Sequence, residues 1–157
     1  MNLSDMVRKM QQLGYETDDA EARVCQDIVL KAISKSTLSR NVTIKGGVVM
    51  RSITNNIRRA TQDMDIDFIR YSLSDASVDN FVVKLNCIDG ITITRVGRIE
   101  ELSQQDYKGK RVNVHIKDTH GNLIESKIDL GVHKHMELSR KNIVLILLLM
   151  MGGHHFL

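Results

Sequence analysis

Three aspartates alternate with apolar residues in the string DMDIDF, which spans positions 63–68. They are Asp63, Asp65 and Asp67. Strict alternation predicts a β-strand with the aspartates on one face and the apolar residues on the other. Like charges this close together repel, so stability alone gives no reason for the pattern. A divalent cation removes the conflict, because carboxylate oxygens suit Mg²⁺ and a pair of such ions can assist an in-line displacement. The pattern therefore indicates metal-assisted transfer chemistry.

Two other interpretations of the same string have to be compared with this one. An Asp-x-Asp strand also occurs by chance on the solvated face of a sheet, and the string alone leaves that alternative open. A calcium loop of the Asp-x-Asp-x-Asp-Gly type is excluded, because Phe68 stands where the loop needs glycine. Ser74 also stands where the loop needs a bidentate glutamate.

A glycine pair, Gly46-Gly47, follows a short stretch at 41–45 that reads as a strand. At a strand-to-helix junction, such glycines allow close backbone approach and present amide groups at a helix N-terminus, which suits phosphate. The pair is not a Walker P-loop, because Lys45 precedes the glycines and no Gly-Lys-Ser/Thr follows. When the pair is taken alone, a plain turn is the commoner explanation. In combination with the aspartate strand it favours a nucleotide site.

The string KGGVVMRSITNNIRRATQDMDIDFI resembles the first motif of the polymerase-beta-like nucleotidyltransferases. More narrowly, it resembles the AbiEii/AbiGii (MenT-type) toxin family. In that family a Gly-Gly or Gly-Ser pair, a helix, an Arg-x-Thr/Ser and an Asp-x-Asp strand occur in this order. The resemblance covers residues 40–70 closely and 15–135 loosely. It implies a nucleotidyltransferase-like mixed sheet flanked by helices, a nucleoside triphosphate bound with Mg²⁺ or Mn²⁺, and nucleotidyl transfer. In some family members the acceptor is RNA such as tRNA, and partners include a cognate antitoxin.

The resemblance also implies roles for individual residues. Gly46 and Gly47 match the phosphate-binding turn. Asp63 and Asp65 match the metal-binding pair, and Asp67 is a reserve ligand at the next position on the same face.

Three further residues complete the expected site. Arg59 and Thr61 match the residues that lead into the strand, where a guanidinium can contact phosphate, although a surface arginine explains Arg59 equally well. Nucleotidyltransferases of this kind use a third carboxylate from a neighbouring strand, which is thought to help activate the acceptor hydroxyl. Asp129 is the best candidate, because Ile128 and Leu130 would face the core and leave Asp129 on the other face. An ordinary exposed aspartate is the alternative.

The chain departs from the family in two places. Val48 stands where many members have a hydroxyl or a small residue near the triphosphate. The helical second half of the family, with its lysine and further basic motifs, has no counterpart after Lys141. Residues 143–151 are wholly apolar but fewer than the roughly 20 that a membrane-spanning helix takes. We therefore expect a catalytic domain over 1–140 and an apolar tail over 141–157 that is truncated or frame-shifted.

The other elements predicted from the sequence must position this site. Periodicity predicts helices at about 4–14, from Thr17 or Asp18 onward, over 49–60 and from Ser74 to about 86. It predicts strands at 41–45, 63–69, 91–96, 111–117 and 123–130, with a hairpin turn at His120-Gly121-Asn122. The N-cap of the first helix is expected at Ser4. One face of the second helix carries Val24, Cys25, Ile28, Val29, Ala32 and Ile33. This order predicts an α+β domain with a mixed sheet.

Composition sets the general class. The chain has 157 residues, 42% of them hydrophobic and 26% charged, which is typical of one globular domain. A net charge of +3 and an absence of Trp give no sign of a basic or stacking surface for nucleic acid. Cys25 and Cys87 are expected to be reduced thiols in the core. The N-terminus lacks the apolar core of a signal peptide, so we expect a cytoplasmic protein.

Two hypotheses about function follow from these observations. The first is an Mg²⁺-dependent nucleotidyltransferase that uses a nucleoside triphosphate and acts on an RNA or protein acceptor, with a cognate antitoxin as partner and no membrane. The alternative is a non-catalytic fragment or pseudoenzyme that binds an antitoxin-like protein or RNA. A purely structural module is the third possibility and would make the aspartate strand accidental. The pair His133-x-His135 lacks a third ligand at suitable spacing, so solvated histidines explain it better than a metal site.

Overall fold

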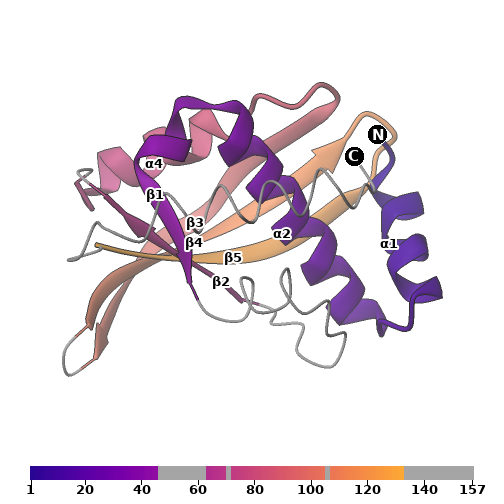
Figure 1. Ribbon diagram of the computed structural model, residues 1–157, viewed down its shortest axis with the longest axis horizontal. Helices are drawn as coiled ribbons and strands as arrows, with labels where there is room; N and C mark the ends of the chain where they lie inside the picture. Colours follow the sequence, from indigo (N-terminus) through magenta and orange to yellow (C-terminus); the bar gives the residue numbers. More distant parts are fainter. Residues whose placement is uncertain (46–62, 70–71, 105–106, 133–157) are drawn as a thin grey trace.

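A five-stranded mixed sheet with helices packed on it forms the frame of the molecule (Figure 1). The structure, a computed structural model, describes residues 1–45, 63–69, 72–104 and 107–132. The elements are α1 (Leu3–Gln12), α2 (Thr17–Lys35), the 3₁₀ helix η1 (Thr37–Arg40), β1 (Val42–Lys45), β2 (Asp63–Phe68), α4 (Asp75–Lys84), β3 (Ile91–Gln104), β4 (Tyr107–Asp118) and β5 (Leu123–Val132). The strand order is β1-β2-β5-β4-β3. Strands β2 and β5 are parallel and the other neighbours are antiparallel. The predicted α+β class with a mixed sheet is confirmed.

One face of the sheet forms the core. On β2 the apolar residues Met64, Ile66 and Phe68 are buried, as their alternation predicts. On β5 the residues Ile128 and Leu130 are fully buried on the same face. Burying each large apolar side chain stabilises the fold by about 1.5–3 kcal/mol. Burial of this face therefore determines which side of each strand is turned away from the core.

Helix α2 crosses the sheet and is the most deeply buried helix among the described residues (Figure 1). The six residues predicted to share its apolar face are all buried. Gln26 and Asp27 are buried as well, so burial extends around the helix beyond a single stripe. Arg23 donates to Asp27 over 2.7 Å and to the Tyr15 hydroxyl over 3.1 Å. Burial opposes the charge on Arg23, but Asp27 and Tyr15 outweigh this effect and raise the pKa of the guanidinium.

The start of α1 differs from its prediction. The side chain that caps the helix belongs to Asn2, which accepts a hydrogen bond from the Asp5 amide over 3.1 Å, and Ser4 lies inside the first turn. The reason is a tertiary contact: the Leu3 amide donates to Asp118 over 2.8 Å, at the turn between β4 and β5. The helix therefore begins where this turn holds it.

The β3–β4 hairpin is longer than its predicted strands. Val96 pairs with Asn113, and pairing then resumes at Glu100 with Arg111 after a bulge. Gly97 lies in this bulge with a φ of 72°, which a glycine adopts without strain. The predicted end at residue 96 was wrong because the bulge interrupts the alternation without ending the strand. The predicted turn at 120–122 is confirmed, with Gly121 at a φ of 87°.

The two thiols differ in their surroundings. Cys25 is buried, and burial raises the pKa of its thiol to about 12. Cys87 is exposed, so its predicted place in the core was wrong. Ile88 takes the neighbouring buried position instead.

The tail at 141–157, the histidines at 133 and 135 and the helix expected over 49–60 lie outside the described residues. No helix in the described part of the chain is long and apolar enough to cross a membrane.

Candidate functional site

Asp65 and Asp129 lie side by side in the sheet. Strand β2 pairs with β5 in parallel, and Asp65 is the register partner of Asp129. Register partners on neighbouring strands project to the same side of the sheet and lie about 4.8 Å apart. For these two residues, that side is the one turned away from the core. The position of Asp63 precedes Asp65 by two residues on the same face and has Lys127 as its partner. Three predicted site positions are therefore brought together.

The aspartates of β2 have different environments. Asp65 is exposed, whereas Asp67 is only 2% exposed and lies across from the buried Thr43 of β1. The side chain of Asp63 is outside the described set, so only its backbone position is known. Of the two described carboxylates on β2, Asp65 is the one that an exogenous ligand can reach.

Asp129 is held by an arginine that the sequence analysis did not identify. Strand β4 places Arg111 opposite Asp129. The Nε atom of Arg111 donates to Oδ1 over 2.6 Å, and Nη2 donates to Oδ2 over 3.0 Å. This two-point arrangement fixes the plane of the carboxylate as well as its position. A guanidinium in this geometry also suits phosphate, so Arg111 belongs to the candidate site.

The alternation of β4 contained the signal that identifies Arg111. Val112, Val114 and Ile116 are buried, which places Arg111 on the opposite face. The hairpin turn predicted at 120–122 already made these two strands neighbours, but the register that places Arg111 opposite Asp129 came from the structure.

The neighbouring lysine anchors this part of β4. Lys110 lies on the core side of the strand and pairs with Asp75 at the start of α4 over 2.7 Å. This hydrogen bond raises the pKa of Lys110. A second pair joins Arg95 of β3 to Asp79 of α4 over 2.6 Å. Both pairs attach the hairpin to α4 and so hold the backbone on which Arg111 sits.

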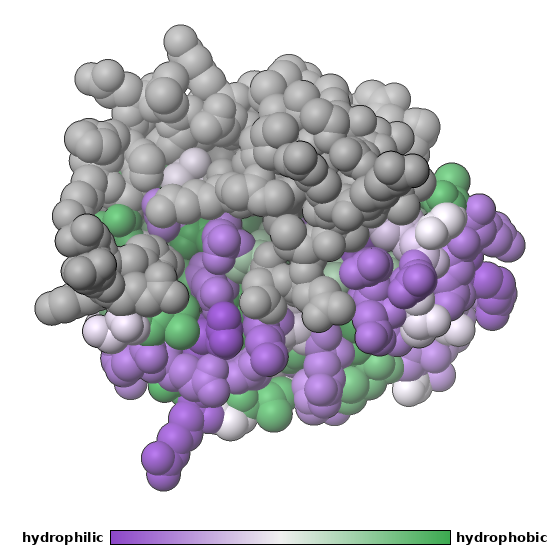
Figure 2. Space-filling view, turned by 90° about the horizontal axis from the view of Figure 1, so that it is seen from below, coloured by the Kyte–Doolittle hydropathy of each residue, from purple (hydrophilic) through white to green (hydrophobic). Residues whose placement is uncertain are grey.

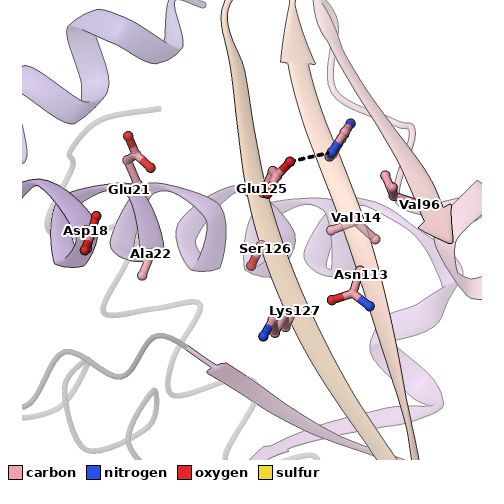
Figure 3. A pocket seen from close by; sticks show the side chains of 10 residues that line it. Asp18, Glu21, Ala22, Val96, Asn113, Val114, Glu125, Ser126 and Lys127 are labelled. Carbon is pink, nitrogen blue, oxygen red and sulfur yellow. Dashed lines mark hydrogen bonds and ion pairs between the residues drawn. The ribbon is translucent and has the colours of Figure 1, made fainter. Parts of the chain in front are cut away.

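A cleft of about 550 Å³ lies beside β5, and its lining includes Lys127, the register partner of Asp63 (Figure 3). Its lining residues from α2, β4 and β5 include Asp18, Glu21, Asn113, His115, Glu125 and Lys127. The register explains the position of the cleft. Strand β2 begins opposite Lys127, so residues 123–126 of β5 have only β4 as a paired neighbour among the described strands. The beginning of α2 lies beside that part of β5 (Figure 3).

The surface seen in Figure 2 is mainly hydrophilic where residues are described, with smaller apolar areas between them. The remaining predicted site residues, Gly46, Gly47, Arg59 and Thr61, lie outside the described residues. Among the side chains that are described, no three from His, Cys, Asp and Glu are grouped so that they could hold a metal ion.

No family model matches the sequence, and no curated protein matches it significantly. The resemblance to nucleotidyltransferases therefore stays a prediction.

Proposed function

We propose that this chain is an Mg²⁺-dependent nucleotidyltransferase. The observation that carries the proposal is the parallel register that sets Asp65 beside Asp129, with the position of Asp63 two residues away on the same face. Carboxylates at neighbouring positions on one face of a sheet repel one another. The arrangement is therefore better suited to a cation than to an empty surface.

The spacing of these positions suits a cation. Three aspartates, at 63, 65 and 129, gather there, and the basic residues beside them are Arg111, which binds Asp129, and the register partners Lys127 and Lys45. Residues i and i+2 of a strand are about 6.6 Å apart. Oxygen ligands about 2.1 Å from a metal can converge from that spacing. The donor set of carboxylate oxygens also matches the preference of Mg²⁺ for hard ligands.

In the proposed reaction, Asp63 and Asp65 would hold the metal and Asp129 would be the third ligand or the base. When bound, Mg²⁺ supplies charge neutralisation and orientation of the triphosphate. An oxygen of the acceptor hydroxyl forms a bond to the α-phosphorus, the bond to pyrophosphate breaks, and Asp129 accepts the hydroxyl proton. The resemblance alone assigns four further residues to the positioning of the triphosphate: Gly46, Gly47, Arg59 and Thr61. An RNA acceptor and a cognate antitoxin are proposed on the same basis.

A transfer assay tests the proposal. The chain is incubated with each α-labelled nucleoside triphosphate, Mg²⁺ and total RNA, and label in RNA or in protein is measured. We expect Asp65→Asn to lower transfer at least about 100-fold, as loss of a charge-stabilising group does. The matched control is Asp89→Asn, which removes an exposed carboxylate in the turn before β3. Unchanged transfer by a folded Asp65→Asn protein would contradict the proposal.

The Arg111–Asp129 pair favours a second candidate, a pseudoenzyme. A carboxylate with both oxygens bound by a guanidinium is already satisfied and has less need of a metal. Such a chain would bind an antitoxin-like protein or RNA without catalysis. Stable, monodisperse wild-type protein that transfers label without a partner would exclude this candidate.

A further inference from the structure

We propose that the cleft beside β5 binds the nucleoside part of the nucleotide whose phosphates lie at Asp65 and Asp129. The inference rests on the proposed function and extends it to the base and ribose. A cleft of about 550 Å³ lies within the usual size range of small-molecule sites, which is about 300–1,000 Å³.

The register of the sheet connects the cleft to the carboxylates. On β5, Glu125, Lys127 and Asp129 alternate along one face. Glu125 and Lys127 line the cleft, and Lys127 is the register partner of Asp63. Glu125 and Asp129 are four residues apart, or about 13 Å. A nucleotide extended along β5 can therefore place its phosphates at one end of this row and its base at the other.

Lys127 lies between the two ends of the row. Its side chain is exposed, and its register partner is Asp63 at the start of β2. An ammonium group at this point can contact a phosphate as it passes toward the metal. Lys127 therefore lies between the end of the row at Asp129, where the phosphates are proposed to bind, and the end at Glu125.

The far end of the cleft is rich in hydrogen-bond acceptors. Asp18 and Glu21 from α2 and Glu125 from β5 contribute carboxylates, which accept hydrogen bonds and donate none when ionised. Glu125 also pairs with His115 over 3.0 Å, which fixes one side of the cleft (Figure 3). Phosphate is disfavoured beside these three charges. Groups that donate hydrogen bonds are favoured, and a nucleoside presents them as ribose hydroxyls and base amino groups.

This chemistry predicts a preference among the bases. Guanine, adenine and cytosine each carry an amino group, whereas uracil presents two carbonyl oxygens and one ring N–H. A carboxylate can accept from an amino group but repels a carbonyl oxygen. The cleft should therefore favour amino-bearing bases over uracil.

Calorimetric titration with Mg²⁺ tests the inference, with GTP, UTP and inorganic tripolyphosphate as probes. The variants are Glu21→Gln and Glu125→Gln. The control is Glu16→Gln, which makes the same change at the exposed residue just before α2, outside the cleft. We expect each cleft variant to weaken GTP binding by about tenfold, which is the loss of one charge-assisted hydrogen bond. Tripolyphosphate binding should stay unchanged in all of them. Wild-type protein should bind GTP more tightly than UTP.

Three results would overturn the inference in distinguishable ways. If tripolyphosphate binds but GTP affinity is unchanged in both cleft variants, the phosphates lie at the carboxylates and the nucleoside lies elsewhere. If UTP binds as tightly as GTP, the acceptor-rich end does not recognise the base. If neither GTP nor tripolyphosphate binds folded wild-type protein, the proposed function fails and the inference fails with it.

Discussion

Arg111 on β4 binds both carboxylate oxygens of Asp129 on β5, with Nε–Oδ1 and Nη2–Oδ2 distances of 2.6 and 3.0 Å. Asp129 in turn is the register partner of Asp65 on β2. Three adjacent strands thus contribute one row of charged residues to the face of the sheet that is turned away from the core. The middle residue of that row, Asp129, is therefore held in one orientation by Arg111.

A double-mutant cycle measures this pair. We expect the variants Arg111→Gln and Asp129→Asn to be coupled by about 1–2 kcal/mol in the free energy of unfolding, because the hydrogen bonds are charge-assisted and partly shielded. The side chains of Arg111 and Asp129 are 27% and 13% exposed. Urea denaturation of the four proteins gives the coupling. The control is Arg8–Asp5, an exposed pair on α1 that should show about 0.5 kcal/mol or less. Equal coupling in the two pairs would contradict the expectation.

Asp118 should make stability depend on pH. Its carboxylate accepts hydrogen bonds from the amides of Leu3, His120 and Asn122 and from the side chain of Asn122. Burial works against the charge, but these hydrogen bonds outweigh it and hold the pKa of Asp118 below its ordinary value. The folded state therefore binds fewer protons in acid than the unfolded state. The stabilisation is complete above the unfolded pKa of about 4 and is lost as the pH falls toward the folded value.

Urea denaturation at pH 7 and pH 3 tests this dependence. Asp118→Ala should lower the free energy of unfolding by about 1–2 kcal/mol at pH 7, since it removes several hydrogen bonds and the anchor of α1. The difference from wild type should shrink at pH 3. Asp89→Ala, at an exposed position, serves as the control. A difference that is the same at both pH values would show that the charge of Asp118 does not stabilise the fold.

The two cysteines should react at different rates. Cys87 is exposed, whereas Cys25 is buried and the pKa of its thiol is raised to about 12. Because the thiolate is the reactive form, a thiol reagent at pH 8 should modify one cysteine quickly and the other only on unfolding. Cys87→Ser should remove the fast phase. Two fast thiols in the folded wild type would contradict the burial of Cys25.

The faces of the strands could be predicted from sequence, because burial follows period-two alternation. Met64 and Ile66 were assigned to the core in this way, and the same pattern placed Asp65 on the opposite face of the strand. Alternation carries no information about which strands are neighbours. The resemblance alone implied that Asp129 lies on a strand next to Asp65, and the register that sets the two side by side came from the structure.

Local signals also failed where a tertiary contact decided the outcome. The cap of α1 is set by Asp118, which lies far from it in sequence, so Ser4 was the wrong choice. Arg111 was missed for a related reason: an arginine on a polar strand face is ordinary until its cross-strand partner is known. The cleft had no sequence signal, since α2, β4 and β5 all contribute to it.

The most direct test of the central claim is the binding of nucleoside triphosphates by calorimetry, with and without Mg²⁺. Wild type is compared with the double variant Asp63→Asn/Asp65→Asn, with folding of both checked by urea denaturation. The proposed function predicts binding that requires Mg²⁺ in the wild type and is weakened at least about 100-fold in the double variant. Equal binding by the two proteins, or no binding by folded wild type, would contradict it.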